Sequence, residues 1–128
     1  MRYTTGWKES LKNMNKLDDV KKDQDNEIKL LRALGICVKA NKVIFGVPMV
    51  CEALRRGGNN APVIIIEASD TSDGTHKKIA DKAAYYKVRT VRVNCDGATL
   101  ASALGKTSSL AAVALTDSQM CKLIEKYI

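Results

Sequence analysis

The chain has 128 residues, enough to bury one hydrophobic core and too few for two ordinary domains. Its content of 45% hydrophobic and 27% charged residues is typical of a globular protein, and 5% aromatic residues are too few for a platform of stacked bases. The formal net charge of +7 favours a polyanionic partner such as RNA, DNA or an anionic membrane, although the same charge also serves solubility alone. We therefore expect one domain whose function depends on where the basic residues lie.

The cysteine and histidine content excludes several chemistries. The four cysteines are scattered without a CxxC pair, so we interpret them as reduced core thiols of a cytoplasmic protein: Cys37, Cys51, Cys95 and Cys121. His76 is the only histidine, and no group of ligands has metal spacing, so we expect no metal and no cofactor. The chain shows no apolar signal core and no apolar run near the roughly 20 residues of a membrane span, so we expect no membrane association.

The N-terminal region differs from everything after it. Residues 1–26 mix charges of both signs (KESLKNMNKLDDVKKDQDN) and hold few apolar residues, so we predict an appended tail before a domain at residues 27–128. Leu11, Met14 and Leu17 have helical spacing, and a short helix within the tail stays an open alternative.

The first half of the domain alternates between helical and strand patterns. A first amphipathic helix is predicted from an apolar stripe of Ile28, Leu31, Leu34 and Val38. A short strand follows at residues 43–45, and Gly46 turns the chain into a second helix with Pro48 near its first position. Gly57 and Gly58 are expected to end this helix.

The second half continues the alternation around two buried strands. The run VIIIEAS after Pro62 predicts a central strand buried on both faces, and the next helix is expected to be capped by Ser72 or Asp73. The remaining elements are predicted as a strand at 91–95, a short helix at 97–104, a buried strand at 110–117 and a last helix capped by Asp117 or Ser118. Such alternation predicts an α/β fold with helices on both faces of one sheet.

The string Gly105-Lys106-Thr107 resembles the end of a phosphate-binding P-loop. The position of that motif's first glycine is occupied by Leu100. A P-loop runs from strand to helix, so that the helix N-terminus faces the phosphates, whereas here a helix is expected before the loop and a strand after it. We therefore reject nucleotide hydrolysis.

Other candidate groups are few. His76 lacks an evident nucleophile to activate, so we interpret it as a solvated polar residue in the first turn of its helix. Glu67 and Asp70 follow the central strand, where open α/β sheets bind ligands, but such residues more often hold a loop or cap a helix. At Gly46 two interpretations stay open: a helix start that binds a phosphate, with Lys42 just upstream, or a plain strand-to-helix turn.

Three segments together resemble a known family: LGICVKANKVIFGVPMVCEALRRGG, EASDTSDGTHKKIADKAAYYKV and LASALGKT. They are similar to the kink-turn RNA-binding ribosomal proteins of the L-seven-Ae and L-thirty-e family, in particular its bacterial YlxQ-type branch. The resemblance implies a three-layer α-β-α sandwich around a mixed four-stranded sheet. It also implies a binding face for structured RNA. We therefore expect a non-enzymatic protein that binds structured RNA, with ribosomal RNA and ribosomal proteins as candidate partners, and we expect a monomer.

The resemblance places RNA contacts at the glycine turn, the loop after the central strand and the loop before the last strand. With the nearby basic residues, the predicted RNA-binding residues are Lys42, Gly46, Val47, Pro48, Met49, Lys77, Lys78, Lys106, Thr107 and Ser108. The family's strong RNA binders carry Asn, Glu and Lys where this chain has Pro48, Met49 and Glu52. These departures leave an alternative open, in which the fold serves as a protein-interaction module that has lost kink-turn recognition.

Overall fold

The computed structural model describes residues 25–128. The first helix covers residues 25–39 and therefore includes two residues assigned above to the tail. The rest of the predicted tail, with its helical spacing of apolar residues, lies outside the described residues. The buried side of the first helix is rotated from the predicted stripe, because Ala33 and Cys37 face the core with Leu30 and Leu34, whereas Ile28 is 49% exposed.

Four strands form one mixed sheet in the order β1-β4-β2-β3. β2 pairs with β3 in parallel, and β4 pairs antiparallel with both β1 and β2. The elements that follow the first helix are β1 (Val43–Phe45), α2 (Val47–Arg56), a 3-10 turn (Gly58–Asn60), β2 (Ile64–Glu67), α3 (Asp73–Tyr86), β3 (Arg89–Arg92), α4 (Gly97–Ala103), β4 (Ala112–Leu115) and α5 (Ser118–Glu125).

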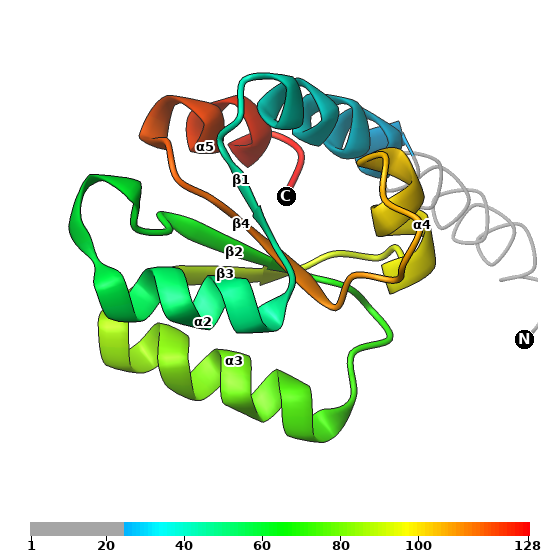
Figure 1. The fold of residues 1–128 in the computed structure, drawn as a ribbon. Helices are drawn as coiled ribbons and strands as arrows, with labels where there is room; N and C mark the ends of the chain where they lie inside the picture. The colour runs from blue at the N-terminus through cyan, green and yellow to red at the C-terminus, as the bar shows by residue number, and fades with distance from the viewer. Residues whose placement is uncertain (1–24) are drawn as a thin grey trace, which may run out of the picture.

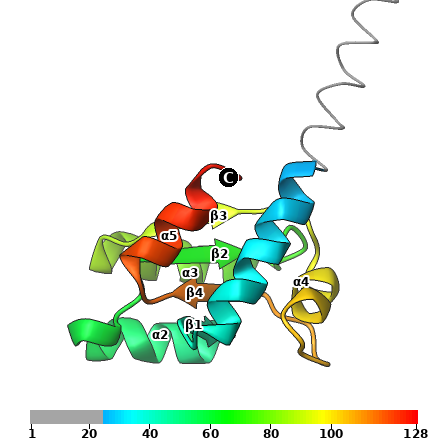
Figure 2. The ribbon, with the colours of Figure 1, turned by 90° about the horizontal axis from the view of Figure 1, so that it is seen from above.

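The helices form a layer on each face of this sheet. Figure 1 shows α2 and α3 side by side beneath the sheet, with the first helix, α4 and α5 above it. Figure 2 looks down on that upper layer, where the first helix crosses the sheet between α4 and α5. The predicted three-layer α-β-α sandwich with a mixed four-stranded sheet is confirmed.

Each layer has its own core, because the two interior strands are buried on both faces. All four residues of β2 and all four of β4 are buried. Ile66 and Val113 face the upper core with Leu34, whereas Ile65 packs in the lower core with Val50. The continuous apolar runs thus predicted central strands correctly, as expected for strands covered by helices on both sides.

One strand lies earlier in the chain than predicted. β3 covers Arg89–Arg92 instead of residues 91–95, although Val93 and Cys95 are buried as the pattern indicated. Their burial comes from packing in the upper core after the strand has ended. The predicted caps Ser72 and Asp117 are confirmed, since each side chain accepts a hydrogen bond from a main-chain N–H of the helix that follows.

The two ends of the sheet carry different sets of connections. At one end β1, β2 and β3 finish and β4 begins, so four connections meet there. We name this end the loop end; its connections are the Gly46 turn and residues 68–72, 93–96 and 104–111. The opposite end holds Lys42, residues 57–63, Lys87 with Val88, and Thr116 with Asp117. α2 and α3 both begin at the loop end (Figure 1).

Candidate nucleic-acid interface

The Gly46 turn opens α2 with an uncapped helix N-terminus. Gly46 has φ 85° and ψ 150°, a conformation that side chains disfavour, and no side chain caps the helix. Its own N–H donates to the carbonyl oxygen of Ala112 at 3.0 Å, which fixes the turn against the start of β4. The first N–H groups of a helix lack partners within it, so the amides of Val47 and Met49 remain for an anion, while Pro48 has none.

Lys106 lies directly beside this turn. Its Nζ is 4.3 Å from the centroid of the Phe45 ring, and Phe45 is the residue before Gly46. The loop that carries Lys106 begins at Gly105, with φ 77°, and also exposes Thr107 and Ser108. A cation held over an aromatic ring next to an uncapped helix start gives this part of the loop end a positive potential.

Hydrogen bonds tie the loop after β2 and the loop before β4 to the start of α4. The Asp70 carboxylate accepts from the N–H of Gly97 at 2.9 Å, and the Gly97 carbonyl accepts from the N–H of Leu110 at 3.1 Å. A Cβ at Gly97 would clash with the side chain of Ser109 and the carbonyl of Leu110, so only glycine fits there. The loops at 68–72 and 104–111 therefore depend on the same glycine between them.

A buried carboxylate holds the loop after β2. Glu67 is 3% exposed, and its Oε2 lies 2.7 Å from His76 Nδ1 and 3.7 Å from Arg92 Nε. Arg92 also donates to the main-chain oxygens of Ser69 at 2.9 Å and Thr71 at 3.4 Å. A carboxylate buried in this way requires such partners, because desolvation strongly disfavours an unpaired charge.

This cluster bears on two predictions. His76 is a solvated polar residue as interpreted, with 47% of its side chain exposed, and in addition its imidazole bonds to Glu67, because the first turns of α3 lie over the end of β2. The expectation that Glu67 and Asp70 hold a loop or a helix start is confirmed. Sequence reasoning missed the role of Arg92. The one available signal was Glu67, a charged residue at the end of the apolar strand β2, because a buried carboxylate must find partners.

The remaining predicted residues separate into two groups. Lys77 and Lys78 are exposed near the start of α3, at the loop end. Lys42 is exposed at the opposite end, where its carbonyl accepts from Thr116 N–H at 3.0 Å. The three residues of β1 separate it from Gly46, and the four steps of extended chain span about 13 Å. The structure therefore does not bring Lys42 to the Gly46 turn, and the Val47 side chain is buried, which leaves its amide alone for contact.

The residues that depart from the family's RNA-binding pattern lie along α2. Pro48 is exposed, and Met49 has 60% of its surface exposed. The Glu52 carboxylate accepts hydrogen bonds from Arg55 at 2.7 Å and from Arg56 at 3.1 Å, and the bond from Arg55 is the main reason that its pKa lies below the ordinary value. Glu52 is thus a paired anion, and its two arginine partners cover the charge.

Groups suited to catalysis are poorly placed. Desolvation by burial raises the pKa of Cys37 and Cys121, and raises that of Cys95 to about 11, so these thiols are weak nucleophiles at neutral pH. Among residues 25–128, no group of three or more His, Cys, Asp or Glu side chains is arranged to hold a metal ion.

No helix among residues 25–128 is long and apolar enough to cross a membrane.

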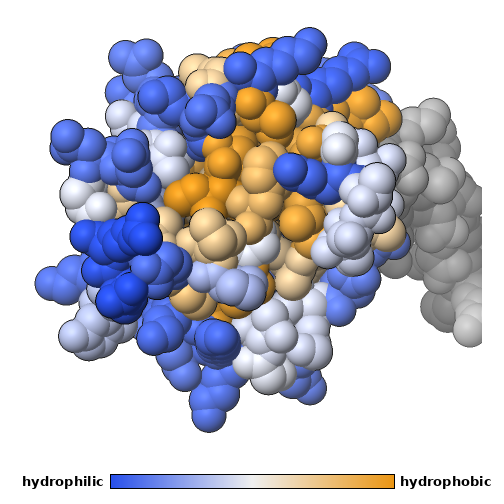
Figure 3. Space-filling model, in the orientation of Figure 1, coloured by the Kyte–Doolittle hydropathy of each residue, from blue (hydrophilic) through white to orange (hydrophobic). Residues whose placement is uncertain are grey.

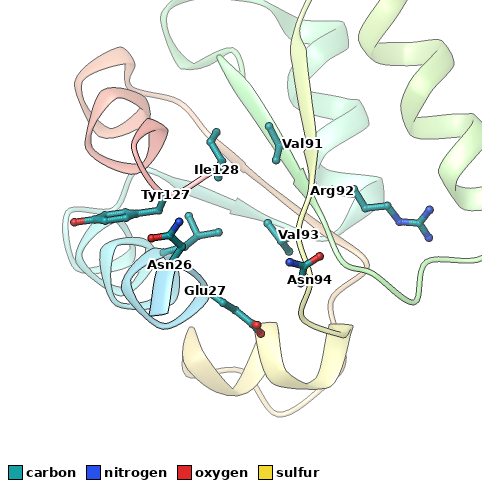
Figure 4. Close-up of a pocket in the computed structure, with 9 residues that line it drawn as sticks. Asn26, Glu27, Val91, Arg92, Val93, Asn94, Tyr127 and Ile128 are labelled. Carbon is teal, nitrogen blue, oxygen red and sulfur yellow. The ribbon is translucent and has the colours of Figure 1, made fainter. Parts of the chain in front are cut away.

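A cavity of about 280 Å³ lies beside the end of β3, between the start of the first helix and the C-terminal residues Tyr127 and Ile128. Figure 4 shows Val91, Val93 and Ile128 directed toward its apolar part, with Asn26 and Glu27 at the rim. The Arg92 side chain points the other way, toward the loop after β2.

Comparisons with known proteins find relatives that match much of the chain. Over 84 residues the chain is 34% identical to the RNA-binding protein YlxQ of Bacillus subtilis, a match that covers 66% of this chain and 79% of that protein. Over 66 residues it is 32% identical to the protein of the same name from Enterococcus faecium, where the match covers 52% of this chain and 61% of the relative.

Solved structures share the architecture. A Bacillus halodurans protein of unknown function is similar with a TM-score of 0.64 and 26% identity, covering 76% of this chain and 97% of that chain. A 15.5kD RNA binding protein from Giardia lamblia also has a TM-score of 0.64, at 12% identity, covering 80% and 84%, which shows a common fold. The model of the ribosomal protein L7Ae/L30e/S12e/Gadd45 family matches residues 28–124, and the chain belongs to this family.

Proposed function

We propose that this chain binds structured RNA at the loop end and acts without catalysis. The observation that carries the proposal is the position of Lys106 over Phe45, which joins the basic loop before β4 to the uncapped start of α2 at Gly46. Backbone N–H groups and a fixed cation at one point are suited to a phosphate of a bent RNA backbone.

The contacts fall into two classes. The amides of Val47 and Met49, with the ammonium group of Lys106, bind phosphate oxygens, and the hydroxyl groups of Thr107 and Ser108 add hydrogen bonds. Lys77 and Lys78 extend the positive surface along the start of α3. Lys42 is left out of this interface, because it lies at the opposite end of β1.

The finer part of the proposal is recognition of a kinked RNA on the ribosome, in the cytoplasm. The names of the YlxQ relatives and membership of the family support RNA as the partner class. Pro48 and Met49 offer no side-chain hydrogen bonds to base edges, so we propose that the chain reads the shape of a kink through phosphates more than through bases.

A gel-shift comparison tests this proposal. A kink-turn RNA and a straight duplex of equal length are titrated with the full chain at several salt concentrations. We expect tighter binding of the kinked RNA and a linear fall of log affinity with log salt. Equal and weak binding to both RNAs contradicts recognition of structure. Sedimentation with ribosomes, before and after nuclease treatment, tests the association with ribosomes separately.

A second candidate function is supported by one observation, a partly apolar hollow between β1 and α2. The hollow of about 280 Å³ is lined by the apolar side chains of Ile44, Met49 and Ala53 and by the polar side chains of Glu52, Arg56, Asn59 and Asn60. Figure 3 shows apolar side chains across the middle of this face, between α2 and the first helix, with hydrophilic ones around them. Exposed methionine is favoured at adaptable protein contacts, so a protein-interaction module is the alternative.

Met49→Asp and Lys106→Ala together separate the two functions. The first substitution places a negative charge in the hollow and next to the proposed phosphate site. A protein-interaction module loses its attachment to ribosomes in this variant even when no RNA affinity exists in the wild type. An RNA-binding protein shows affinity for isolated RNA in the wild type, and Lys106→Ala lowers it while leaving the hollow intact.

A further inference from the structure

The outer face of α3 carries basic and aromatic side chains beyond the interface described above. Lys78, Lys82 and Tyr85 follow at intervals of four and three residues, so they lie on one face of the helix, and we name them the α3 stripe. All three side chains are exposed. Tyr85 has 78% of its surface exposed, the largest value among the exposed large hydrophobic residues in the described part of the chain.

The Tyr85 ring contacts one neighbouring ring, and the residue is otherwise largely exposed. Its centroid lies 4.8 Å from that of Tyr86, with the ring planes at 78°, an edge-to-face arrangement. Tyr86 in turn packs against the lower core, so it holds its neighbour in place. A supported and largely exposed ring is what a single-stranded base needs for stacking.

The α3 stripe is continuous with the loop end. α3 begins there, and Lys78 lies near the start of the helix. Seven residues of helix separate Lys78 from Tyr85, which is about 10 Å along the helix axis. A strand that leaves the loop end along α3 covers this distance with about three stacked nucleotides at about 3.4 Å each.

We propose that single-stranded RNA flanking the folded element runs along the α3 stripe, with its phosphates against Lys78 and Lys82 and one base stacked on Tyr85. This inference rests on the proposed RNA-binding function and adds a second partner chemistry, an unpaired flank. Lysine is depleted from protein interfaces and suited to phosphates, which favours RNA over a protein on this face. Asp81 lies beside Tyr85, away from Lys82, and its charge confines the phosphates to the Lys82 side.

The test compares one kink-turn RNA with and without a single-stranded oligoadenosine flank of about six nucleotides, long enough for the stretch from Lys78 to Tyr85. The flank is placed at the 5′ end in one RNA and at the 3′ end in another. We expect one of the flanked RNAs to bind wild-type protein about fivefold or more tightly than the unflanked RNA, the gain of one stacked base.

Substitutions at Tyr85 separate stacking from apolar contact. Tyr85→Phe keeps the ring and is expected to keep the gain from the flank, whereas Tyr85→Leu and Tyr85→Ala are expected to lose it. Lys82→Ala is expected to lower the salt dependence contributed by the flank. Lys122→Ala is the matched control, because Lys122 is an exposed lysine on α5, in the other helix layer. Every substituted side chain is exposed, although Tyr85 also contacts the ring of Tyr86. Circular dichroism is therefore expected to show unchanged folding.

The outcomes distinguish this inference from the function on which it rests. Equal affinity for flanked and unflanked RNA overturns the inference and leaves structured-RNA binding intact. A gain that persists in Tyr85→Leu or Tyr85→Ala also overturns it, because the ring is then unnecessary. Absence of binding to every RNA by the wild-type protein overturns both proposals. A flank-dependent gain that follows the aromatic ring supports both.

Discussion

The two ends of the sheet differ in how their connections are held. In residues 25–128 the buried polar side chains are Glu67 and Thr71, and both lie at the loop end. There, main-chain bonds between segments are supplemented by bonds from side chains to main-chain groups, as between the Asp70 carboxylate and the N–H of Gly97 at the start of α4. At the opposite end, the links between connections are mainly main-chain bonds, such as Val63 N–H to the Leu115 carbonyl at 2.8 Å. The difference indicates that the loop end is held rigid at the cost of burying polar groups, as expected for a binding surface.

The largest effect is expected from removing the buried carboxylate. Glu67→Ala leaves His76 and Arg92 without their shared partner and frees the loop after β2, so we expect unfolding by urea to show a loss of about 3 kcal/mol. Glu125→Ala at the opposite end breaks only the exposed ion pair with Arg89, and is expected to cost less than about 1 kcal/mol. Similar losses in the two variants would remove the distinction between the ends.

A second substitution tests the glycine that joins two loops. Gly97→Ala forces a Cβ against the Leu110 carbonyl, so we expect a loss of about 2 kcal/mol by urea or thermal unfolding. Gly74→Ala is the matched control, because nothing lies within 4 Å of a Cβ at this helical position. The control is expected to stabilise α3 slightly, by about 0.5 kcal/mol. An unchanged stability of Gly97→Ala would mean that the loops adjust freely.

The two ends each offer a threonine whose hydroxyl bonds to a main-chain oxygen. Thr71 Oγ1 donates to the Ala68 carbonyl at 2.8 Å in a buried setting, whereas Thr116 Oγ1 donates to the Lys42 carbonyl at 3.4 Å in an exposed one. Replacement by valine keeps the shape and removes the hydroxyl. We expect Thr71→Val to cost about 1 kcal/mol and Thr116→Val to be close to neutral in urea unfolding. A reversed order would contradict the contrast.

The smallest effects are expected from removing one lysine at each end of the sheet and measuring RNA affinity. Lys106→Ala removes one phosphate contact, so we expect binding to the kink-turn RNA to weaken about fivefold and the salt slope to fall by about 1. Lys42→Ala removes the same charge at the opposite end and is expected to change affinity by less than about twofold at physiological salt, since long-range interactions are screened there. Equal effects would mean that net charge alone governs binding.

Much of the fold could be predicted from residue patterns. The continuous apolar run after Pro62 identified a central strand, because only a strand covered on both faces tolerates such a run. The strand at Arg89–Arg92 was placed too late, since burial of Val93 and Cys95 arises from helix packing, which periodicity does not separate from strand pairing.

The candidate site was harder to predict, because its parts are distant in the sequence. The Gly46 turn and the loop at Lys106 were identified separately, but their contact depends on the antiparallel pairing of β1 with β4. Lys42 lies at the far end of its strand, because the extended residues of β1 stand between it and Gly46. The bond between His76 and Glu67 likewise requires knowledge of how α3 lies over β2.

The most direct test of the central claim is amide chemical-shift mapping by NMR as kink-turn RNA is added to the full chain. If the loop end is the RNA interface, the largest shifts occur at the amides of Gly46, Val47, Met49 and Lys106, while residues 57–63 and Thr116 change little. Shifts concentrated at Lys42, Thr116 and residues 57–63 would contradict the account.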